Sequence, residues 1–207
     1  MTTQTIHDFT AETTTRAPDR ILPQKAGNAL WGPMFVMALM GFAVGFVLAI
    51  VKANLIATGG DPNQIAALVH YGTGAMFFGF ASVFASISFA IAKILGEFRV
   101  GGGSVQEAVG PNVKTLKMPA TAKAFIVIMA MAMMLIFAAV VLHVGAGAAI
   151  QGGGVTSAAA EQWFIWIEAA RRFGVVLYLF SIMLGLVTIA KVIRFQTFRI
   201  REVAETA

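Results

Sequence analysis

Apolar residues in this chain are gathered into four long runs that are separated by short polar segments. The runs cover about residues 29–51, 65–95, 120–150 and 173–193. A bilayer core about 30 Å thick is crossed by roughly 20 apolar residues in a helix, so each run is long enough to span a membrane. The pattern therefore predicts an all-α integral membrane protein, a bundle of four transmembrane helices within residues 28–195.

The segment before the first run is polar. Residues 1–27 are rich in Thr and contain Pro18 and Pro23. So polar a stretch has little apolar area to bury, and the prolines oppose a continuous helix, so we expect a flexible polar tail. The tail lacks the early apolar stretch of a secretory signal. Gly32-Pro33 is expected to lie where the first helix begins, because proline is tolerated in the first helical turn.

Two amphipathic segments flank the fourth run. WFIWIEAARR precedes it, and we expect an interfacial helix over about residues 160–172, with Trp163 and Trp166 at the depth of the lipid headgroups. The basic end at residues 196–207 is expected to continue helically along anionic headgroups.

Composition narrows the class of protein further. Hydrophobic residues make up 58% of the chain and charged residues only 12%, about half of what a water-facing surface requires. A soluble globular enzyme is therefore excluded. The chain contains no Cys, which removes disulfides, thiolate catalysis and iron–sulfur clusters from consideration.

The positive charges predict the orientation in the membrane. With four spans both termini share one side, and that side would hold 12 of the 15 Lys and Arg residues. The other side would keep Lys52, Arg171 and Arg172. The positive-inside rule then places both termini in the cytoplasm, and we expect a bacterial inner membrane. Because the basic residues stand at the ends of apolar runs and form no recognition motif, nucleic acid is not an expected partner.

Small residues at helical spacing predict close helix packing. Gly41 and Gly45 form a GxxxG pair in the first run, and the second run repeats small residues four apart, as in Ala81 and Ala85. Helices in lipid associate where small side chains let their backbones approach. Since small residues fall on more than one face of the second run, we expect it to be the most buried helix.

Two histidines are the exceptions in otherwise apolar spans. His70 lies near the start of the second run and His143 near the end of the third, so both fall at the outer end of neighbouring antiparallel helices. Imidazoles on facing helices at one depth can ligate a b-type haem on both faces. Arg171 and Arg172 lie on the same side and would pair with the haem propionates. The residues expected to leave room for the macrocycle and to line it are Gly72, Gly74, Gly145, Gly147, Met76, Phe77 and Phe78.

Three other interpretations of these residues remain open. A histidine at the membrane interface is also an ordinary amphipathic side chain. Copper or zinc could be held by the two histidines together with carboxylates of the outer side, namely Asp61, Glu161 and Glu168. Glu168 could instead form ion pairs with Arg171 and Arg172, which follow it at i+3 and i+4.

The function expected from the sequence is that of a subunit. The chain offers no evident nucleophile or general base, and its spans lack the acidic relays of pumps. We expect membrane lipid and other membrane or peripheral subunits as partners. The leading hypothesis is a quinone-linked electron-transfer subunit that carries haem b. The alternative is a cofactor-free accessory subunit that anchors a membrane enzyme, followed by a small channel or transporter.

Overall fold

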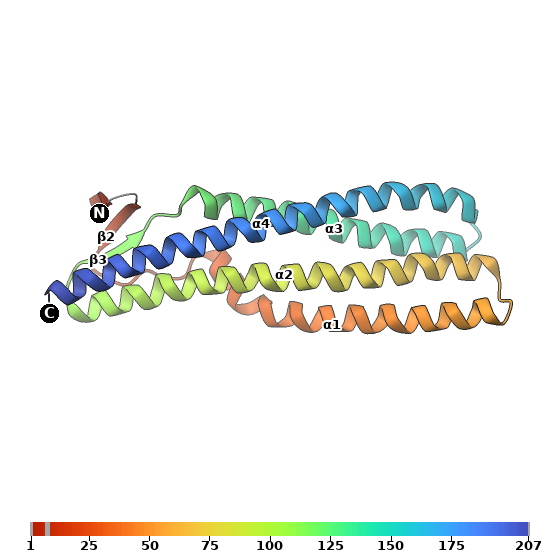
Figure 1. The fold of residues 1–207 in the computed structure, drawn as a ribbon, viewed down its shortest axis with the longest axis horizontal. Coiled ribbons are helices and arrows are strands. Elements are labelled where there is room, and N and C mark those ends of the chain that lie inside the picture. Colours follow the sequence, from red (N-terminus) through yellow and green to blue (C-terminus); the bar gives the residue numbers. More distant parts are fainter. Residues whose placement is uncertain (1, 7–8, 207) are drawn as a thin grey trace. The chain divides into compact units, whose positions relative to one another are not determined.

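The computed structural model describes residues 2–6 and 9–206, and these contain four α-helices and three short β-strands (Figure 1). The elements in chain order are β1 (Thr2–Ile6), β2 (Phe9–Thr14), α1 (Leu22–Ala57), α2 (Pro62–Val109), β3 (Val113–Leu116), α3 (Ala120–Gln151) and α4 (Ser157–Thr206). Each helix is long and apolar enough to cross a membrane. The prediction of four membrane helices is thus confirmed at the level of length and composition, which indicates a membrane-embedded protein.

The helices are longer than the apolar runs. α2 has 48 residues and α4 has 50, which correspond to about 72 and 75 Å at 1.5 Å per residue, more than twice the thickness of a bilayer core. Helix α4 continues without a break through residues 160–172, so the expected interfacial helix is part of a longer one. Pro33 lies inside α1 rather than at its beginning.

Two compact units divide the described chain. Unit 1 comprises residues 1–31, 87–127 and 180–207, and unit 2 comprises residues 32–86 and 128–179. All four helices contribute a segment to each unit. In α1 the division falls just before Pro33, which cannot donate the helical hydrogen bond to residue 29. Each unit is described by itself below.

Unit 1 contains a sheet that the sequence analysis did not anticipate. The three strands pair antiparallel in the order β1-β2-β3, with Ala11 opposite Leu116 and Thr14 opposite Val113. The expectation that residues 1–27 form a flexible tail is therefore corrected, since β1, β2 and the start of α1 all fall there. The Thr-rich stretch suits a strand, but its partner β3 lies about 100 residues away, where local patterns do not reveal it.

Polar contacts join the segments of unit 1 to one another. Arg20 forms a salt bridge of 2.8 Å with Glu97, Lys114 pairs with Glu202, and the Gln196 amide donates to the carbonyl of Phe98 at 2.7 Å. Burial alternates along β3, where Val113 and Thr115 are buried. The sheet thus turns one face toward the helices of its own unit.

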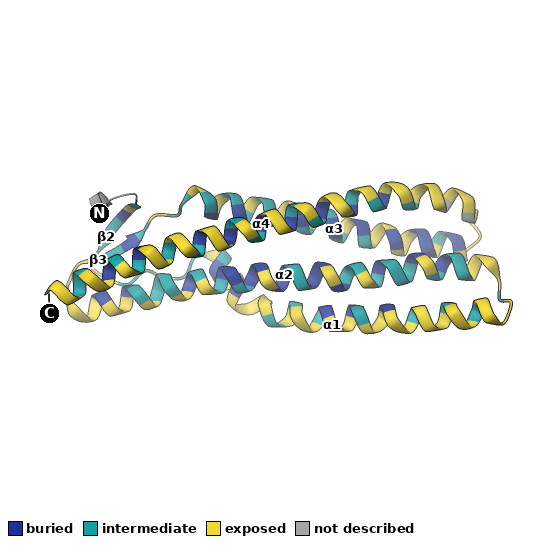
Figure 2. Cartoon of the chain, viewed as in Figure 1, coloured by how far each residue is buried: buried dark blue, intermediate teal, exposed yellow. Residues whose placement is uncertain are grey.

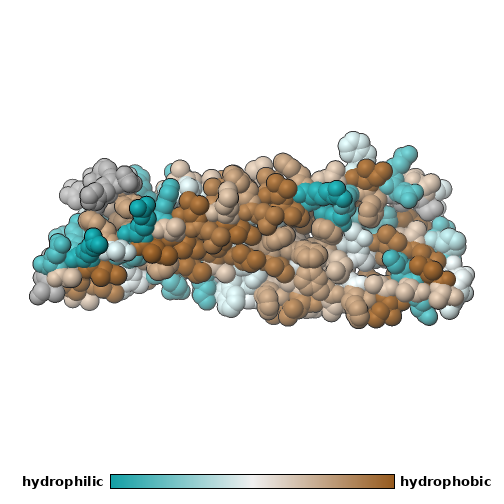
Figure 3. Space-filling view, in the orientation of Figure 1, coloured by the Kyte–Doolittle hydropathy of each residue, from teal (hydrophilic) through white to brown (hydrophobic). Residues whose placement is uncertain are grey.

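Unit 2 is a bundle of four helix segments with an apolar core. Its central cluster consists of Ala81, Ala132, Ile136 and Tyr178, all at most 1% exposed. Many of its exposed side chains are apolar as well, for example Phe46 and Val141, and hydrophobic residues cover much of the drawn surface (Figures 2 and 3). Such a surface suits a lipid environment, because lipid tails are as apolar as the side chains that they meet.

The predicted close packing is present in unit 2. A Cβ atom built at Gly41 would lie 2.7 Å from the backbone nitrogen of Gly79, and one at Gly45 would lie 2.7 Å from the sulfur of Met76. The first two helices therefore touch through their small residues. Helix α2 is also the most buried one: half of its most apolar 18-residue window is buried, against 17–28% for the other helices.

Candidate functional site: a histidine pair and an arginine-lined groove

The two histidines predicted as ligands meet inside unit 2. His70 of α2 is 4% exposed and His143 of α3 is fully buried. Their Nδ1 atoms lie 3.3 Å apart, so one ring can donate a hydrogen bond to the other. An ionisable pair in the interior of a membrane bundle marks a candidate functional site.

Aromatic and small residues enclose the histidine pair. Phe164 of α4 lies edge-on to both rings, with centroid distances of 5.4 Å to His70 and 5.2 Å to His143. A Cβ built at Gly74 would lie 3.2 Å from the Cβ of His143, so this glycine lets α2 and α3 approach at the site. Within the described residues, Nε2 of His143 is buried without a hydrogen-bond partner.

The observed ring contact does not accommodate a haem between the two histidines. Two axial imidazole nitrogens stand on opposite sides of the metal, which at metal–nitrogen distances of about 2.0 Å places them about 4 Å apart with the macrocycle between them. The Nδ1 atoms are closer than that, and the rings touch directly. Of the glycines expected to leave room for a haem, Gly74 lies against His143, whereas a Cβ built at Gly145 meets nothing within 4 Å and one at Gly147 would meet Tyr71.

The carboxylates of the alternative copper or zinc site do not join the histidines. The Asp61 side chain accepts a hydrogen bond from the backbone N–H of Asn63 at 3.1 Å, and Glu168 pairs with two arginines. In residues 2–6 and 9–206, no three His, Asp or Glu side chains are grouped so that they could hold a metal ion.

The two arginines of α4 are placed differently. Arg172 is exposed over 78% of its side chain and donates from Nε to Glu168 at 2.8 Å. Arg171 is only 8% exposed; it also pairs with Glu168, and its guanidinium lies 3.5 Å from the ring centroid of Phe77. The ion pairs expected from the i+3 and i+4 spacing are thus present. Only the structure shows that Arg171 points inward.

Arg171 has free hydrogen-bonding capacity in the interior. Its Nε and Nη1 atoms are buried and have no hydrogen-bond partner in the described part of the chain. A guanidinium can donate five hydrogen bonds, and a buried donor without an acceptor costs about 1–3 kcal/mol. The arrangement therefore favours a ligand that brings an acceptor atom to Arg171.

Arg171 lines a groove between helices of unit 2. The groove has a volume of about 770 Å³, within the range of ligand sites. Most of its wall is apolar and aromatic, with Thr73, Lys52 and Arg171 as its polar side chains. The residues are Phe42, Gly45, Phe46, Ala49 and Lys52 of α1, Leu68, Val69, Gly72, Thr73, Met76, Phe77 and Phe80 of α2, and Arg171 of α4.

Sequence reasoning missed most of this groove. Met76, Phe77 and Gly72 were expected near the site, but Phe42, Phe46 and Thr73 were not. The available signal was their helical spacing, since Phe42 and Phe46 are four residues apart and share one face of α1. Comparison with protein-family models, with curated proteins and with solved structures gives no match.

Proposed function

We propose that this protein is a multi-pass membrane subunit of a larger electron-transfer assembly and that it binds a lipid-soluble quinone in the groove lined by Arg171. The observation that carries the proposal is the buried guanidinium of Arg171, which offers two unpartnered nitrogens to an apolar, aromatic groove. Quinones have the matching chemistry: a flat apolar ring that carries carbonyl acceptors and an apolar tail.

The electrostatics of Arg171 favour a neutral acceptor over a charged lipid headgroup. Glu168 already pairs with the guanidinium, so Arg171 has one anionic partner, which it shares with Arg172. A phosphate headgroup would have to leave water to reach a side chain that is 8% exposed, which is costly for an ion. A quinone carbonyl reaches the same donors without that penalty and accepts a charge-assisted hydrogen bond.

The histidine pair lies next to the groove in the chain, because His70 directly follows Val69, which lines it. In this proposal the imidazoles are a proton-holding group of the same unit, and electrons come from a redox centre of a partner subunit. The chain itself then binds and positions the quinone. We further propose that both termini lie in the cytoplasm of a bacterial inner membrane, which the distribution of Lys and Arg supports.

The test is quinone binding by the purified chain in nanodiscs, measured by equilibrium dialysis with a short-chain benzoquinone. The wild type should bind it saturably, and Arg171→Gln should weaken binding about 10-fold or more, as for the loss of a hydrogen bond to a charged group. Arg172→Gln is the matched control, since it removes the neighbouring partner of Glu168 and should leave affinity unchanged. Equal affinities of the two variants, or a tightly bound phospholipid in place of the quinone, would overturn the proposal.

A second variant keeps the test valid if Arg171→Gln fails to fold. Gly72 lines the groove, and a Cβ built there has only the Leu48 Cβ within 4 Å, at 3.9 Å. Gly72→Leu should therefore fill the groove and abolish binding while the bundle stays folded. Gly145→Leu makes the same exchange on α3, where the added Cβ meets nothing within 4 Å, and should bind like the wild type.

Haem b on His70 and His143 is a second proposal for the same unit. Its support is that the two imidazoles stand on neighbouring helices, as a bis-histidine site requires. It requires the two rings to part. A reduced-minus-oxidised visible spectrum tests this second proposal. A b-type α-band that His70→Ala abolishes and His7→Ala retains would support haem. No band in the fully assembled complex would exclude haem and keep only the quinone proposal.

A further inference from the structure

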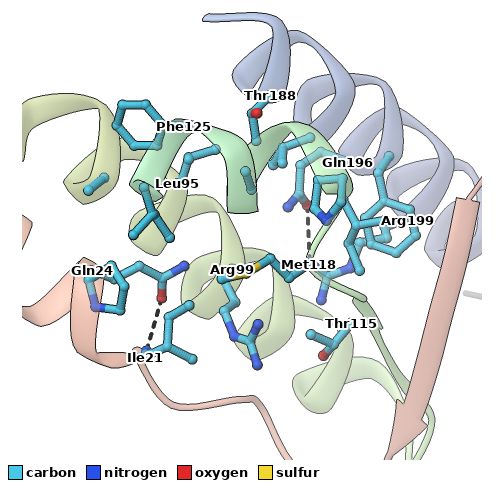
Figure 4. A pocket seen from close by; sticks show the side chains of 18 residues that line it. Ile21, Gln24, Leu95, Arg99, Thr115, Met118, Phe125, Thr188, Gln196 and Arg199 are labelled. Atoms are coloured by element: carbon cyan, nitrogen blue, oxygen red, sulfur yellow. Dashed lines mark hydrogen bonds between the residues drawn. The ribbon is translucent and has the colours of Figure 1, made fainter. Parts of the chain in front are cut away.

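Unit 1 contains a second pocket, which is smaller and independent of the groove in unit 2. Its volume is about 80 Å³, and it lies among α1, α2, β3, α3 and α4 (Figure 4). Much of the wall is apolar, including Leu95, Phe125 and Phe195. Arg99, Thr115 and Arg199 supply polar atoms from three different elements.

The two arginines give the pocket a positive charge. None of the described residues that line it is Asp or Glu. Arg199 is 3% exposed and is held by neutral amides: its Nε donates to Gln106 at 2.8 Å and its Nη1 to Gln196 at 3.2 Å. These amides orient the guanidinium but leave its charge uncompensated, which is unfavourable in the interior unless an anion is present.

Three carboxylates of unit 1 have partners other than the pocket residues Arg99 and Thr115. Glu97 accepts from Arg20, Glu202 pairs with Lys114, and Glu107 accepts a hydrogen bond from the backbone of Ala17 at 3.0 Å. Nη2 of Arg199 keeps an open donor position in the described residues, and an external anion would fill it.

Unpartnered donors face the same space. Nε of Arg99, Nη2 of Arg199 and Oγ1 of Thr115 are buried and lack a hydrogen-bond partner in residues 2–6 and 9–206. All three can donate a hydrogen bond. Three donors without acceptors around one small pocket, two of them on cations, match the oxygens of an oxyanion.

We propose that this pocket binds a phosphate-sized oxyanion through Arg99, Arg199 and Thr115. A water molecule occupies about 30 Å³ of liquid, so the volume equals two or three waters or one oxyanion group. A whole lipid does not fit, but the phosphate of a lipid headgroup has the same chemistry as free phosphate. Both sources are compatible with the donors, and the experiment separates them.

The experiment uses the full chain. One arm measures binding of radiolabelled inorganic phosphate to delipidated protein in detergent by equilibrium dialysis. The other arm reconstitutes the chain in nanodiscs with and without phosphatidic acid and measures retained lipid by mass spectrometry. Saturable phosphate binding without retained lipid would identify the ligand of the pocket as a free anion. Retained phosphatidic acid would identify it as a lipid headgroup. If neither binds, the pocket holds water and the proposal is overturned.

Variants test the residues. Arg99→Gln should weaken binding about 10-fold or more in whichever arm is positive, because it removes a charged donor. Arg201→Gln is the control, since Arg201 is exposed on the same helix as Arg199 and does not line the pocket. Thr115→Val keeps the shape and removes one donor; it should weaken binding a few-fold and leave the ligand-free protein as stable as before. Equal affinity of Arg99→Gln and Arg201→Gln would contradict the assignment.

Discussion

The two units use the same four helices but hold them together in different ways. In unit 2, α1 and α2 touch backbone to backbone at Gly41 and Gly79, and the core around Tyr178 is apolar. In unit 1, buried Arg199 is held by two glutamines, and the Arg20–Glu97 and Lys114–Glu202 ion pairs cross between elements. Close packing of small residues, as in unit 2, is what holds helices together in lipid. The buried polar groups of unit 1 need hydrogen-bond partners, which the glutamines and carboxylates provide.

Each unit also has its own site. The groove of unit 2 offers an arginine that already pairs with a glutamate, in a mostly apolar wall, which suits a neutral acceptor. The pocket of unit 1 offers two guanidinium groups without a carboxylate in its described lining, which suits an anion. We therefore propose different ligands for the two arginines, because Arg171 pairs with a carboxylate whereas neutral amides hold Arg199.

The largest expected effect comes from emptying the core of unit 2. Tyr178 is fully buried against Ala81 and Ile136, so Tyr178→Ala should lower the free energy of unfolding by about 3–5 kcal/mol. Tyr178→Phe should be neutral or stabilising, because in the described residues the hydroxyl is buried without a partner. Unfolding in detergent measures both. A Phe variant as damaged as the Ala variant would show that the hydroxyl has a partner.

The next effect tests the backbone contact in unit 2. Gly41→Leu should cost about 1–3 kcal/mol or more, because its Cβ would lie 2.7 Å from the Gly79 nitrogen and the two helices would have to separate. Gly32→Leu is the matched control, since a Cβ at Gly32 meets nothing within 4 Å. The thermal midpoints of the two variants give the comparison. Equal midpoints would mean that α1 does not pack closely against α2.

The smallest effect belongs to unit 1. The Arg20–Glu97 pair is partly exposed, so Arg20→Gln should change the free energy of unfolding by about 1 kcal/mol or less. The loss should shrink as salt is raised, because ions screen exposed charges. Thermal unfolding of wild type and variant at low and high salt measures this, and a loss that is independent of salt would point to packing instead of charge.

Much of the fold followed from local patterns. The four helices could be placed from their apolar runs, and Gly41 and Gly45 indicated where α1 meets α2. The sheet could not be placed, because β2 pairs with β3 across about 100 residues. The helix ends were also missed, since α1 continues through Pro33 and α2 continues through the glycines at 101–103, where local propensity opposes a helix.

The candidate sites show the same division. The sequence singled out His70, His143 and Arg171 as the polar residues of apolar or amphipathic segments, and the structure brings the two histidines into contact. The pocket with Arg99, Thr115 and Arg199 was missed because its residues lie on α2, β3 and α4, far apart in the chain. No spacing rule connects such positions.

The sequence by itself determined that this protein has four long apolar helices, because the hydropathy of each residue does not depend on its place in the fold. Only the tertiary structure decided that Arg171 points inward while Arg172 points outward, and that two histidines touch instead of flanking a macrocycle. Those outcomes depend on helix rotation and on interhelical distance. Both are set by the packing of whole helices against one another and not by any local run of residues.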